Sequence, residues 1–240
     1  MTFNFNNHSI KIFTDGANLD SISQLASDPS IDGITTNPTL MRSSGVTNYM
    51  TFAKAAIKVS HGKSLSLEVF SDDHEEMIKQ ARILASLSFN VYVKVPITNS
   101  FGISSMEVIR KLSNENINLN ITAILTKEQI DICYESLNNN SRAYISIFAG
   151  RIADTGRDPI KFINYALDKF KDFRNIEVLW ASTREVYNIY QALDCNCHII
   201  TVTPAIIKKI QLKDYDLKKL SLETVQMFKR DSEKANYRIF

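Results

Sequence analysis

The sequence of 240 residues is poor in glycine, proline and cysteine, with only 7, 5 and 3 of them. The scarcity of glycine excludes a collagen-like repeat. No G-x-G-x-x-G or G-x-x-x-x-G-K-[ST] loop occurs either, so we expect no nicotinamide, nucleotide or other cofactor. The cysteines are Cys133 and the C-x-C pair Cys195 and Cys197. An odd number in this arrangement does not indicate a disulfide framework and favours a reducing, cytoplasmic setting.

The chain also lacks a surplus of either charge and any long apolar run. Its 28 basic and 26 acidic residues give a net charge of +2, which offers no electrostatic footprint for nucleic acid. No apolar run approaches the ~20 residues that a membrane span needs. Residues 1–8 lack the basic and apolar regions of a secretory signal. We therefore expect neither a nucleic-acid nor a membrane partner and, without any linker, a single domain over residues 1–240.

What the sequence does contain is a regular alternation of two patterns. Short runs rich in β-branched residues are each followed by a polar turn and an amphipathic stretch. Successive runs end 21 to 36 residues apart, which is the length that a β–α unit occupies. The eight runs cover residues 10–14, 33–36, 64–69, 91–95, 119–124, 143–148, 178–181 and 198–202.

Helical periodicity fills the intervals between these runs. Residues 72–89, 159–173 and 183–194 repeat apolar side chains on one helical face, and a last amphipathic helix follows a polar turn within residues 212–240. Eight β–α units in this length predict an α/β fold, a single (β/α)8 TIM barrel with a C-terminal helix. An open, doubly wound sheet is the competing architecture, but it usually has fewer strands and carries the glycine-rich turn that is missing here.

Charged residues end several predicted strands, where a barrel of this kind builds its active site. Lys94 lies inside the otherwise apolar run 91–95. Burial of an ammonium is costly and favours the neutral amine, which can attack a carbonyl. Alternatively, Lys94 faces the helices and its stem reaches solvent. Glu68 and Asp15 end two other strands, and although either acid alone could cap a helix, together with Lys94 they supply acid–base groups for carbonyl chemistry.

Two arginines near the last strands indicate an anion site. Arg151 follows the sixth predicted strand, and Arg184 follows the seventh at the start of a predicted helix. A helix N-terminus favours an anion, and a guanidinium adds bidentate geometry for phosphate. Either arginine alone could be an ordinary surface residue. Phosphate sites near the last strands recur on this fold, which strengthens the joint interpretation.

Two motifs resemble signatures of the transaldolase family, within the class I aldolase superfamily of small transaldolases and fructose-6-phosphate aldolases. GITTNPTLM at residues 33–41 resembles the signature of its second strand, and VYVKVPIT at residues 91–98 resembles the segment around its Schiff-base lysine. The resemblance continues through residues 120–123, 147–152, 181–184 and 224–239, so it spans nearly the whole chain. One departure is residues 98–102, a segment one residue longer than the family pattern.

The resemblance implies a role for each matching position. Lys94 would form the imine with the substrate, and Asp15 would handle the proton of its C4 hydroxyl. Glu68 and Thr122 would position and activate a water molecule. The remaining matches are Asn37, Asn120 and Ser146 for the dihydroxyacetone hydroxyls, Phe148 beside them, and Arg151, Ser182 and Arg184 for the phosphate.

The implied activity is transfer of a dihydroxyacetone unit from sedoheptulose 7-phosphate or fructose 6-phosphate to an aldose phosphate, as in the pentose-phosphate pathway. The alternatives are a fructose-6-phosphate aldolase-type lyase, a transaldol enzyme of a specialised sugar pathway, and a phosphosugar-binding barrel without catalysis. The related aldolases carry glutamine at the position of Glu68 and tyrosine at that of Phe148, so both residues favour transfer. Phe148 also has no proton to give to an enamine.

We expect no metal site, because an imine does the work of a Lewis acid and the histidines are scattered. They are His8, His61, His74 and His198. We expect a homo-oligomer that acts on sugar phosphates. In this family the terminal helix can cover a neighbouring subunit, but it could equally close its own barrel.

Overall fold

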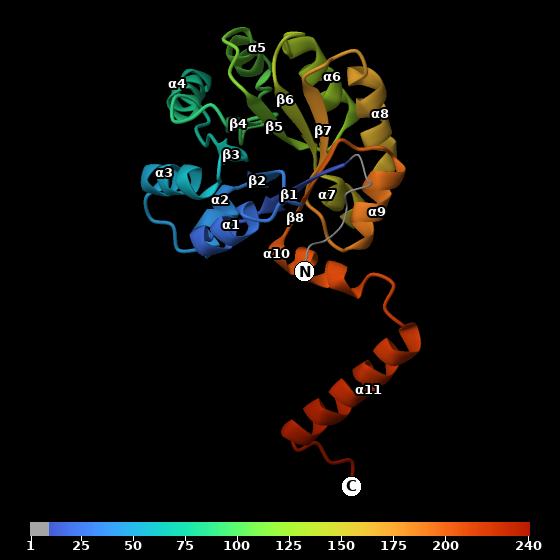
Figure 1. The fold of residues 1–240 in the computed structure, drawn as a ribbon. Helices are drawn as coiled ribbons and strands as arrows, with labels where there is room; N and C mark the ends of the chain where they lie inside the picture. Colours follow the sequence, from blue (N-terminus) through green and yellow to red (C-terminus); the bar gives the residue numbers. More distant parts are fainter. Residues whose placement is uncertain (1–9) are drawn as a thin grey trace.

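The computed structural model describes residues 10–240 and confirms a closed barrel of eight parallel strands, ordered β1 to β8 with β1 paired to β8 (Figure 1). The strands are β1 (Lys11–Asp15), β2 (Gly33–Thr35), β3 (Ser64–Glu68), β4 (Val91–Pro96), β5 (Leu119–Ile124), β6 (Ala143–Ile147), β7 (Ile176–Trp180) and β8 (Ile199–Val202). The expectation for residues 1–8, and with it His8, lies outside the described residues.

Helices surround the barrel, except for α11, which projects away from it (Figure 1). They are α1 (Leu19–Ala26), α2 (Pro38–Ser43), α3 (Tyr49–Val59), α4 (His74–Ala85), α5 (Met106–Asn114), α6 (Lys127–Ser136), α7 (Ala149–Asp154), α8 (Ile160–Phe170), α9 (Tyr187–Asp194), α10 (Pro204–Lys209) and α11 (Leu217–Lys234), with a 3-10 turn η1 (Ile210–Leu212). In the part of the chain that is described, no helix combines the length and apolar character needed to cross a bilayer.

The predicted helices are shorter in the structure than their periodicity suggested, and a polar cap sets the start of one of them. Asp73 accepts a hydrogen bond from the Glu76 amide, which starts α4 at His74. After β2 and β8, Asn37 and Thr203 act as N-caps, and each is followed by a proline in the first helical turn, where a missing N–H is harmless. The chain therefore turns into a helix directly at the carboxyl end of a strand.

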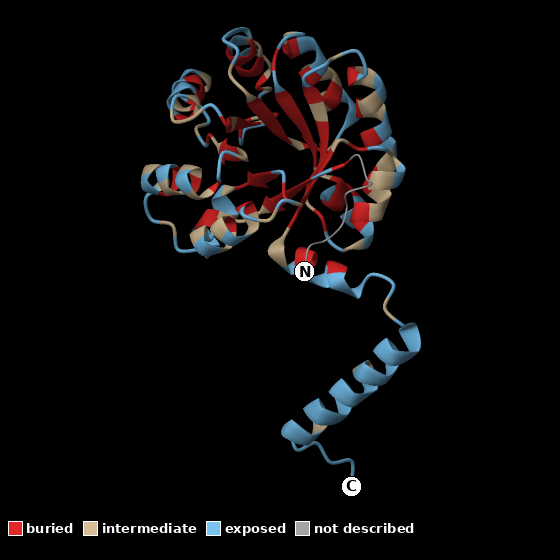
Figure 2. Cartoon of the chain, in the orientation of Figure 1, coloured by how far each residue is buried: buried red, intermediate tan, exposed pale blue. Residues whose placement is uncertain are grey.

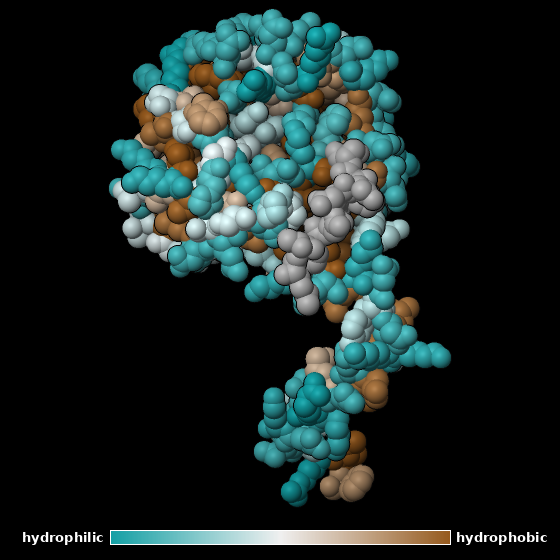
Figure 3. Space-filling model, in the orientation of Figure 1, coloured by the Kyte–Doolittle hydropathy of each residue, from teal (hydrophilic) through white to brown (hydrophobic). Residues whose placement is uncertain are grey.

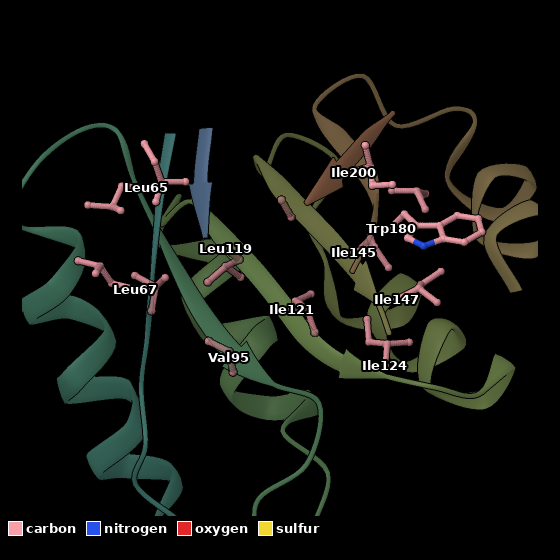
Figure 4. Packing of buried hydrophobic residues seen from close by; sticks show 14 of the residues in the cluster. Leu65, Leu67, Val95, Leu119, Ile121, Ile124, Ile145, Ile147, Trp180 and Ile200 are labelled. Atoms are coloured by element: carbon pink, nitrogen blue, oxygen red, sulfur yellow. The ribbon is translucent and has the colours of Figure 1, made fainter. Parts of the chain in front are cut away.

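Alternation along each strand separates two environments. Leu65 and Leu67 of β3 join the apolar layer between strands and helices, whereas Ser66 and Glu68 do not (Figure 4). The same layer contains Ile121 of β5 and is buried around the whole barrel (Figure 2). Because the outer faces of all strands are apolar, polar residues on the inner faces lie inside the barrel.

Aromatic side chains fill the amino-terminal half of the barrel interior. Tyr92 stacks on Tyr144 at a centroid distance of 4.0 Å, and Phe13 meets Tyr144 edge-on at 5.4 Å. Gly33 makes room for this packing, because a Cβ at its position would lie 2.7 Å from the Phe13 ring. The aromatic rings thus occupy the amino-terminal part of the interior, and the polar side chains lie toward the carboxyl ends of the strands.

Helix α11 leaves the barrel and has no buried residue, as Figures 1 and 2 show. The alternative in which the terminal helix closes its own barrel therefore does not hold. Apolar side chains nevertheless lie on this projecting segment (Figure 3), with Leu217, Leu220, Val225 and Phe228 all exposed.

Candidate active site

Lys94 points into the barrel. Its side chain is 8% exposed, and its Nζ lies 3.1 Å from Glu68 Oε2 and donates to the Thr36 carbonyl oxygen at 2.8 Å. Strand pairing fixes this arrangement, because Glu68 and Lys94 are register partners on β3 and β4. The alternative in which Lys94 faces the helices does not hold. Val93 and Val95 take those outer positions, so the amine is surrounded by polar groups.

Asp15 ends β1 on the same inner surface. Its Oδ1 accepts a hydrogen bond from Thr35 Oγ1 at 3.1 Å, and Thr35 Oγ1 lies 2.6 Å from Thr201 Oγ1. Burial raises the pKa of Asp15 above its ordinary value of 3.8, and the positive charge of Lys94 opposes this rise. A carboxylate with a raised pKa holds a proton more readily than an ordinary aspartate, which suits a general base.

A chain of hydrogen bonds crosses the interior from β6 to β3. Ser146 Oγ donates to Asn120 Oδ1 at 2.6 Å, and Asn120 Nδ2 donates to Ser66 Oγ at 2.9 Å. Thr122 lies on the same inner face of β5 and is 2% exposed, and its Oγ1 has no hydrogen-bond partner within residues 10–240. A buried hydroxyl of this kind calls for a partner, such as a water or a ligand.

These side chains line one cavity of about 110 Å³ at the carboxyl ends of the strands. Its lining consists of Asp15, Thr35, Asn37, Lys94, Asn120, Thr122, Ser146, Phe148, Arg151, Leu179, Ala181, Ser182 and Thr201. The structure thus brings together all the site residues expected from the sequence except two. Glu68 lies just outside the lining but contacts Lys94.

Helix α7, which follows β6, and the loop after β7 supply the cationic side of the cavity. The Arg151 guanidinium lies 5.6 Å from the centroid of the Phe148 ring, a cation–π contact that holds the arginine beside Ser182. Gly150 allows α7 to meet the loop after β7, because a Cβ there would lie 1.6 Å from the Ser182 carbonyl oxygen. A larger residue at this position would push the helix and the loop, and the groups that they carry, apart.

Arg184 is the second exception and does not line the cavity. Its side chain is 51% exposed and pairs with Asp154 Oδ2 at 2.5 Å, at the end of α7. The backbone amides of Arg184 and Glu185 donate to Asn188 Oδ1, which delays the start of α9 to Tyr187. The free N–H groups that a longer helix would have offered to an anion are therefore partly occupied.

The sequence from residue 12 to residue 239 matches the family described as Transaldolase/Fructose-6-phosphate aldolase. The chain belongs to this family. A relative from Nitrosopumilus maritimus, named "Probable transaldolase", is 33% identical over 228 residues. The matched segment covers 94% of this chain and 96% of the relative. A relative of the same name from a Thermoanaerobacter species is 31% identical over 231 residues and is covered to 100%, with 96% of this chain.

Solved barrels resemble the structure at low identity. KGPDC from Streptococcus mutans superimposes with a TM-score of 0.56 at 9% identity, covering 83% of this chain and 89% of that one. The 3-hexulose-6-phosphate synthase from Salmonella typhimurium gives a TM-score of 0.54 at 13% identity, covering 83% and 90%. At these identities the likeness shows the fold alone.

Several residues that support the candidate site were not identified from the sequence. The Thr36 carbonyl accepts from Lys94, and the Thr36 hydroxyl donates to the Ser66 carbonyl at 2.8 Å. Thr35 and Thr36 lie within the motif GITTNPTLM, so the motif itself was the available signal. Thr201 lies on β8, outside both motifs, so no sequence pattern pointed to it.

Tyr49, the first residue of α3, is a further supporting residue. Its hydroxyl donates to the Glu68 carbonyl at 2.7 Å, and its ring meets the Phe70 ring edge-on at 5.4 Å. Both contacts fix the backbone that carries the Glu68 carboxylate. Burial raises the pKa of the Tyr49 hydroxyl, so this group acts as a neutral donor.

The lengthened segment 98–102 after β4 is attached to the loop after β3. The Ser100 amide and hydroxyl both donate to the Asp72 carboxylate at 2.7 Å, and Asn99 Nδ2 donates to the Asp72 carbonyl at 3.0 Å. These two bonds from Ser100 lower the pKa of Asp72. The extra residue is thus accommodated in a pinned loop beside the end of the strand that carries Lys94.

A wider concavity of about 940 Å³ lies at the opposite end of the barrel, among residues that include Arg142 and Arg174. Its two lysines, Lys11 and Lys171, are exposed, and Lys11 is paired with Glu177 at 2.8 Å, so this concavity lacks the buried amine of the smaller cavity. Across residues 10–240, no group of three or more histidine, cysteine, aspartate or glutamate side chains is arranged to hold a metal ion.

The coupling between Lys94 and Asp15 can be tested by titration. Because the Lys94 charge lowers the pKa of Asp15, Lys94→Gln should raise that pKa further above its wild-type value. Carbon-13 NMR of the Asp15 side-chain carboxyl against pH measures the change. Lys169→Gln, which removes the distant partner of Asp131, should leave the Asp15 titration unchanged. An unaltered Asp15 curve in Lys94→Gln would contradict this electrostatic assignment.

Proposed function

We propose that this chain is a transaldolase that moves a dihydroxyacetone unit from sedoheptulose 7-phosphate or fructose 6-phosphate to an aldose phosphate, through a Schiff base on Lys94. The observation that carries this proposal is one cavity, in a member of this family, that is lined by a buried lysine and the carboxyl group of Asp15, with Glu68 paired to the lysine from just outside the lining. Nucleophile and acid–base groups are then within reach of one substrate.

The cavity has two ends of different chemistry, which supports a phosphorylated ketose as the donor. Arg151 and Ser182 would bind the phosphate, and Arg184 would join them only after leaving Asp154. Asn37 and the bonded pair Asn120 and Ser146 would hold the hydroxyls of the dihydroxyacetone part. The substrate carbonyl then lies toward Lys94, between these ends.

The first step forms the covalent link. Glu68 accepts a proton from the Lys94 ammonium, the neutral amine attacks the C2 carbonyl carbon, and the carbonyl oxygen takes up a proton. Loss of that oxygen as water leaves a protonated imine between Nζ and C2. Glu68, 3.1 Å from Nζ, is placed to exchange protons with the amine and with the departing water, beside the unpaired Thr122 hydroxyl.

The second step breaks the C3–C4 bond. Asp15 accepts the proton of the C4 hydroxyl, C4 becomes the aldehyde of the departing aldose phosphate, and the bonding pair moves into the imine to give an enamine. The acceptor aldehyde is then attacked by C3 of the enamine, and its oxygen is protonated by Asp15. Water adds to the new imine, and Lys94 is released.

Phe148 favours transfer over release of free dihydroxyacetone. Release requires a proton to be delivered to C3 of the enamine, and a phenylalanine ring has none to give. Its ring instead supports the Arg151 guanidinium. The enamine therefore persists until an acceptor arrives, which is the property that separates a transferase from a lyase.

We also propose that the protein is a cytoplasmic homo-oligomer. Its cysteines are free, and Cys133 and Cys197 are buried, which suits a reducing compartment. Helix α11 presents Leu217, Leu220 and Phe228 to solvent on one face. An exposed stripe of this kind on a helix without packing of its own supports burial against another subunit.

The covalent intermediate can be trapped. Incubation with fructose 6-phosphate and sodium borohydride should add one reduced sugar-derived adduct, seen by intact mass and mapped to Lys94 by peptide analysis. Lys94→Gln should give no adduct, because no other amine lines the cavity in the described residues. Lys11→Gln, at the far end of the barrel, should retain it. An adduct mapped elsewhere, or none in the wild type, would exclude the Schiff-base proposal.

Dependence on an acceptor distinguishes the transferase from its alternatives. Fructose 6-phosphate should be consumed when erythrose 4-phosphate is present, with sedoheptulose 7-phosphate and glyceraldehyde 3-phosphate formed, and should be nearly stable without it. Sustained release of dihydroxyacetone without acceptor would indicate the lyase. Absence of turnover under both conditions would indicate a binding barrel or another sugar acceptor.

The oligomer can be examined by sedimentation velocity of the full chain. Phe228→Glu should lower the fraction of oligomer, because it places a carboxylate in the apolar stripe that the proposed assembly would bury. Arg230→Glu, on the opposite face of α11, is the matched control and should preserve the wild-type state. A monomeric wild-type protein, or equal behaviour of the two variants, would argue against a role of α11 in assembly.

A further inference from the structure

Strand β5 carries one residue more than its neighbour. Ile121 pairs with Ile145 of β6, and the next pair is Ile124 with Ile147, so three steps along β5 match two along β6. This is a β-bulge. Ala123, within it, has a φ of +62°, in the left-handed region.

The bulge reverses the face that the strand presents. Asn120 and Thr122 face the barrel interior, and regular alternation would also turn Ile124 inward. Ile124 lies instead in the apolar layer between strands and helices and is fully buried there (Figure 4). Because of the extra residue, Thr122 can face the cavity while Ile124 packs in the apolar layer between strands and helices.

The conformation of Ala123 is unusual for its residue type. Seven residues other than glycine have a positive φ in the described part of the chain, and five of them are Asn, Asp or His, the types that most readily adopt it. Those five are His61, Asn116, Asn196, Asp214 and Asn236. The exceptions are Ala123 and Ser182, and both lie at the cavity: one follows Thr122 and the other lines it. Backbone strain of this kind concentrates at functional sites.

The backbone on both sides of Ala123 stays paired. The Thr122 carbonyl accepts from the Ile97 amide at 3.0 Å, and the Ile124 carbonyl accepts from the Phe148 amide at 2.9 Å. The distortion is thus confined to Ala123, which does not line the cavity itself. Its consequence is the fixed position of the unpaired Thr122 hydroxyl in the cavity of Lys94.

We propose that Ala123 is a positioning residue whose left-handed conformation holds the Thr122 hydroxyl in place for the water that hydrolyses the Lys94 imine. This inference rests on the proposed function, in which Thr122 and Glu68 act on that water. Ala123 acts only through Thr122 and touches neither substrate nor the reacting atoms.

The test places valine at each of two positions that have a positive φ, Ala123 and Asn116, and compares the effects on turnover. A β-branched residue strongly disfavours a positive φ, so Ala123→Val should displace Thr122 and lower kcat about tenfold or more, with KM within about twofold because Arg151 and Ser182 are untouched. Asn116→Val, in the turn that precedes β5 at its other end, imposes the same conformational penalty. It should lower Tm comparably and leave kcat unchanged.

A double-mutant cycle tests whether Ala123 acts through Thr122. In a Thr122→Ala background, Ala123→Val should cause little further loss of kcat, because the group that it displaces is already absent. Ala123→Gly should restore turnover relative to Ala123→Val and raise Tm by about 2–4 °C above the wild type, since glycine adopts this conformation without strain.

Independent losses of kcat in the cycle, or an equal loss in Asn116→Val, would overturn the inference. If Ala123→Val does not fold, the glycine variant decides: a lower Tm overturns the inference, and a higher Tm with the bulge retained supports it. A wild type that forms no Lys94 adduct refutes the proposed function instead. In that case the crystal structure of Ala123→Val tests whether Ala123 positions Thr122. A displaced Thr122 supports this role, and an unmoved Thr122 contradicts it.

Discussion

The ion pair between Lys94 and Glu68 inside the barrel is the interaction on which the rest of the site depends. Two opposite charges taken out of water must satisfy each other, because leaving one of them unpaired typically destabilises a protein by about 3–5 kcal/mol. Parallel pairing of β3 with β4 puts the two residues side by side, and the Thr36 carbonyl takes a further hydrogen of the amine. Most of the neighbouring polar side chains bond to one another, whereas the Thr122 hydroxyl has no partner within residues 10–240.

The amino-terminal and carboxyl-terminal halves of the barrel interior surround this ion pair in different ways. Toward the amino ends of the strands, the stacked rings of Tyr92 and Tyr144 fill the space beside the charged pair that water could otherwise occupy. Toward the carboxyl ends, hydroxyl and amide groups bond in chains that run from strand to strand. In such surroundings electrostatic interactions are stronger than in water, and the pKa of Asp15 rises because of its burial.

The fold could be predicted because β-branched runs and capped helices both leave local patterns, and strand limits fell within about two residues of those seen. The cavity followed from the polar ends of the strands. The direction of Lys94 could not be predicted, since VYVKVP is apolar on both sides of the lysine, and only its register with Glu68 decides. That Arg184 lies outside the cavity lining could not be predicted, because its partner Asp154 is distant in the sequence. The bulge at Ala123 leaves no compositional trace, as alanine has no preference for that conformation.

Helix α11 stands without tertiary support, and its 18 residues are little longer than the ~12–15 at which isolated helices become marginal in water. In the proposed homo-oligomer its order is governed by mass action: at high dilution the segment should fray toward coil, and on association it should become helical again. Far-ultraviolet ellipticity per residue would accordingly depend on the concentration of the protein itself, which a barrel with a docked terminus would not show.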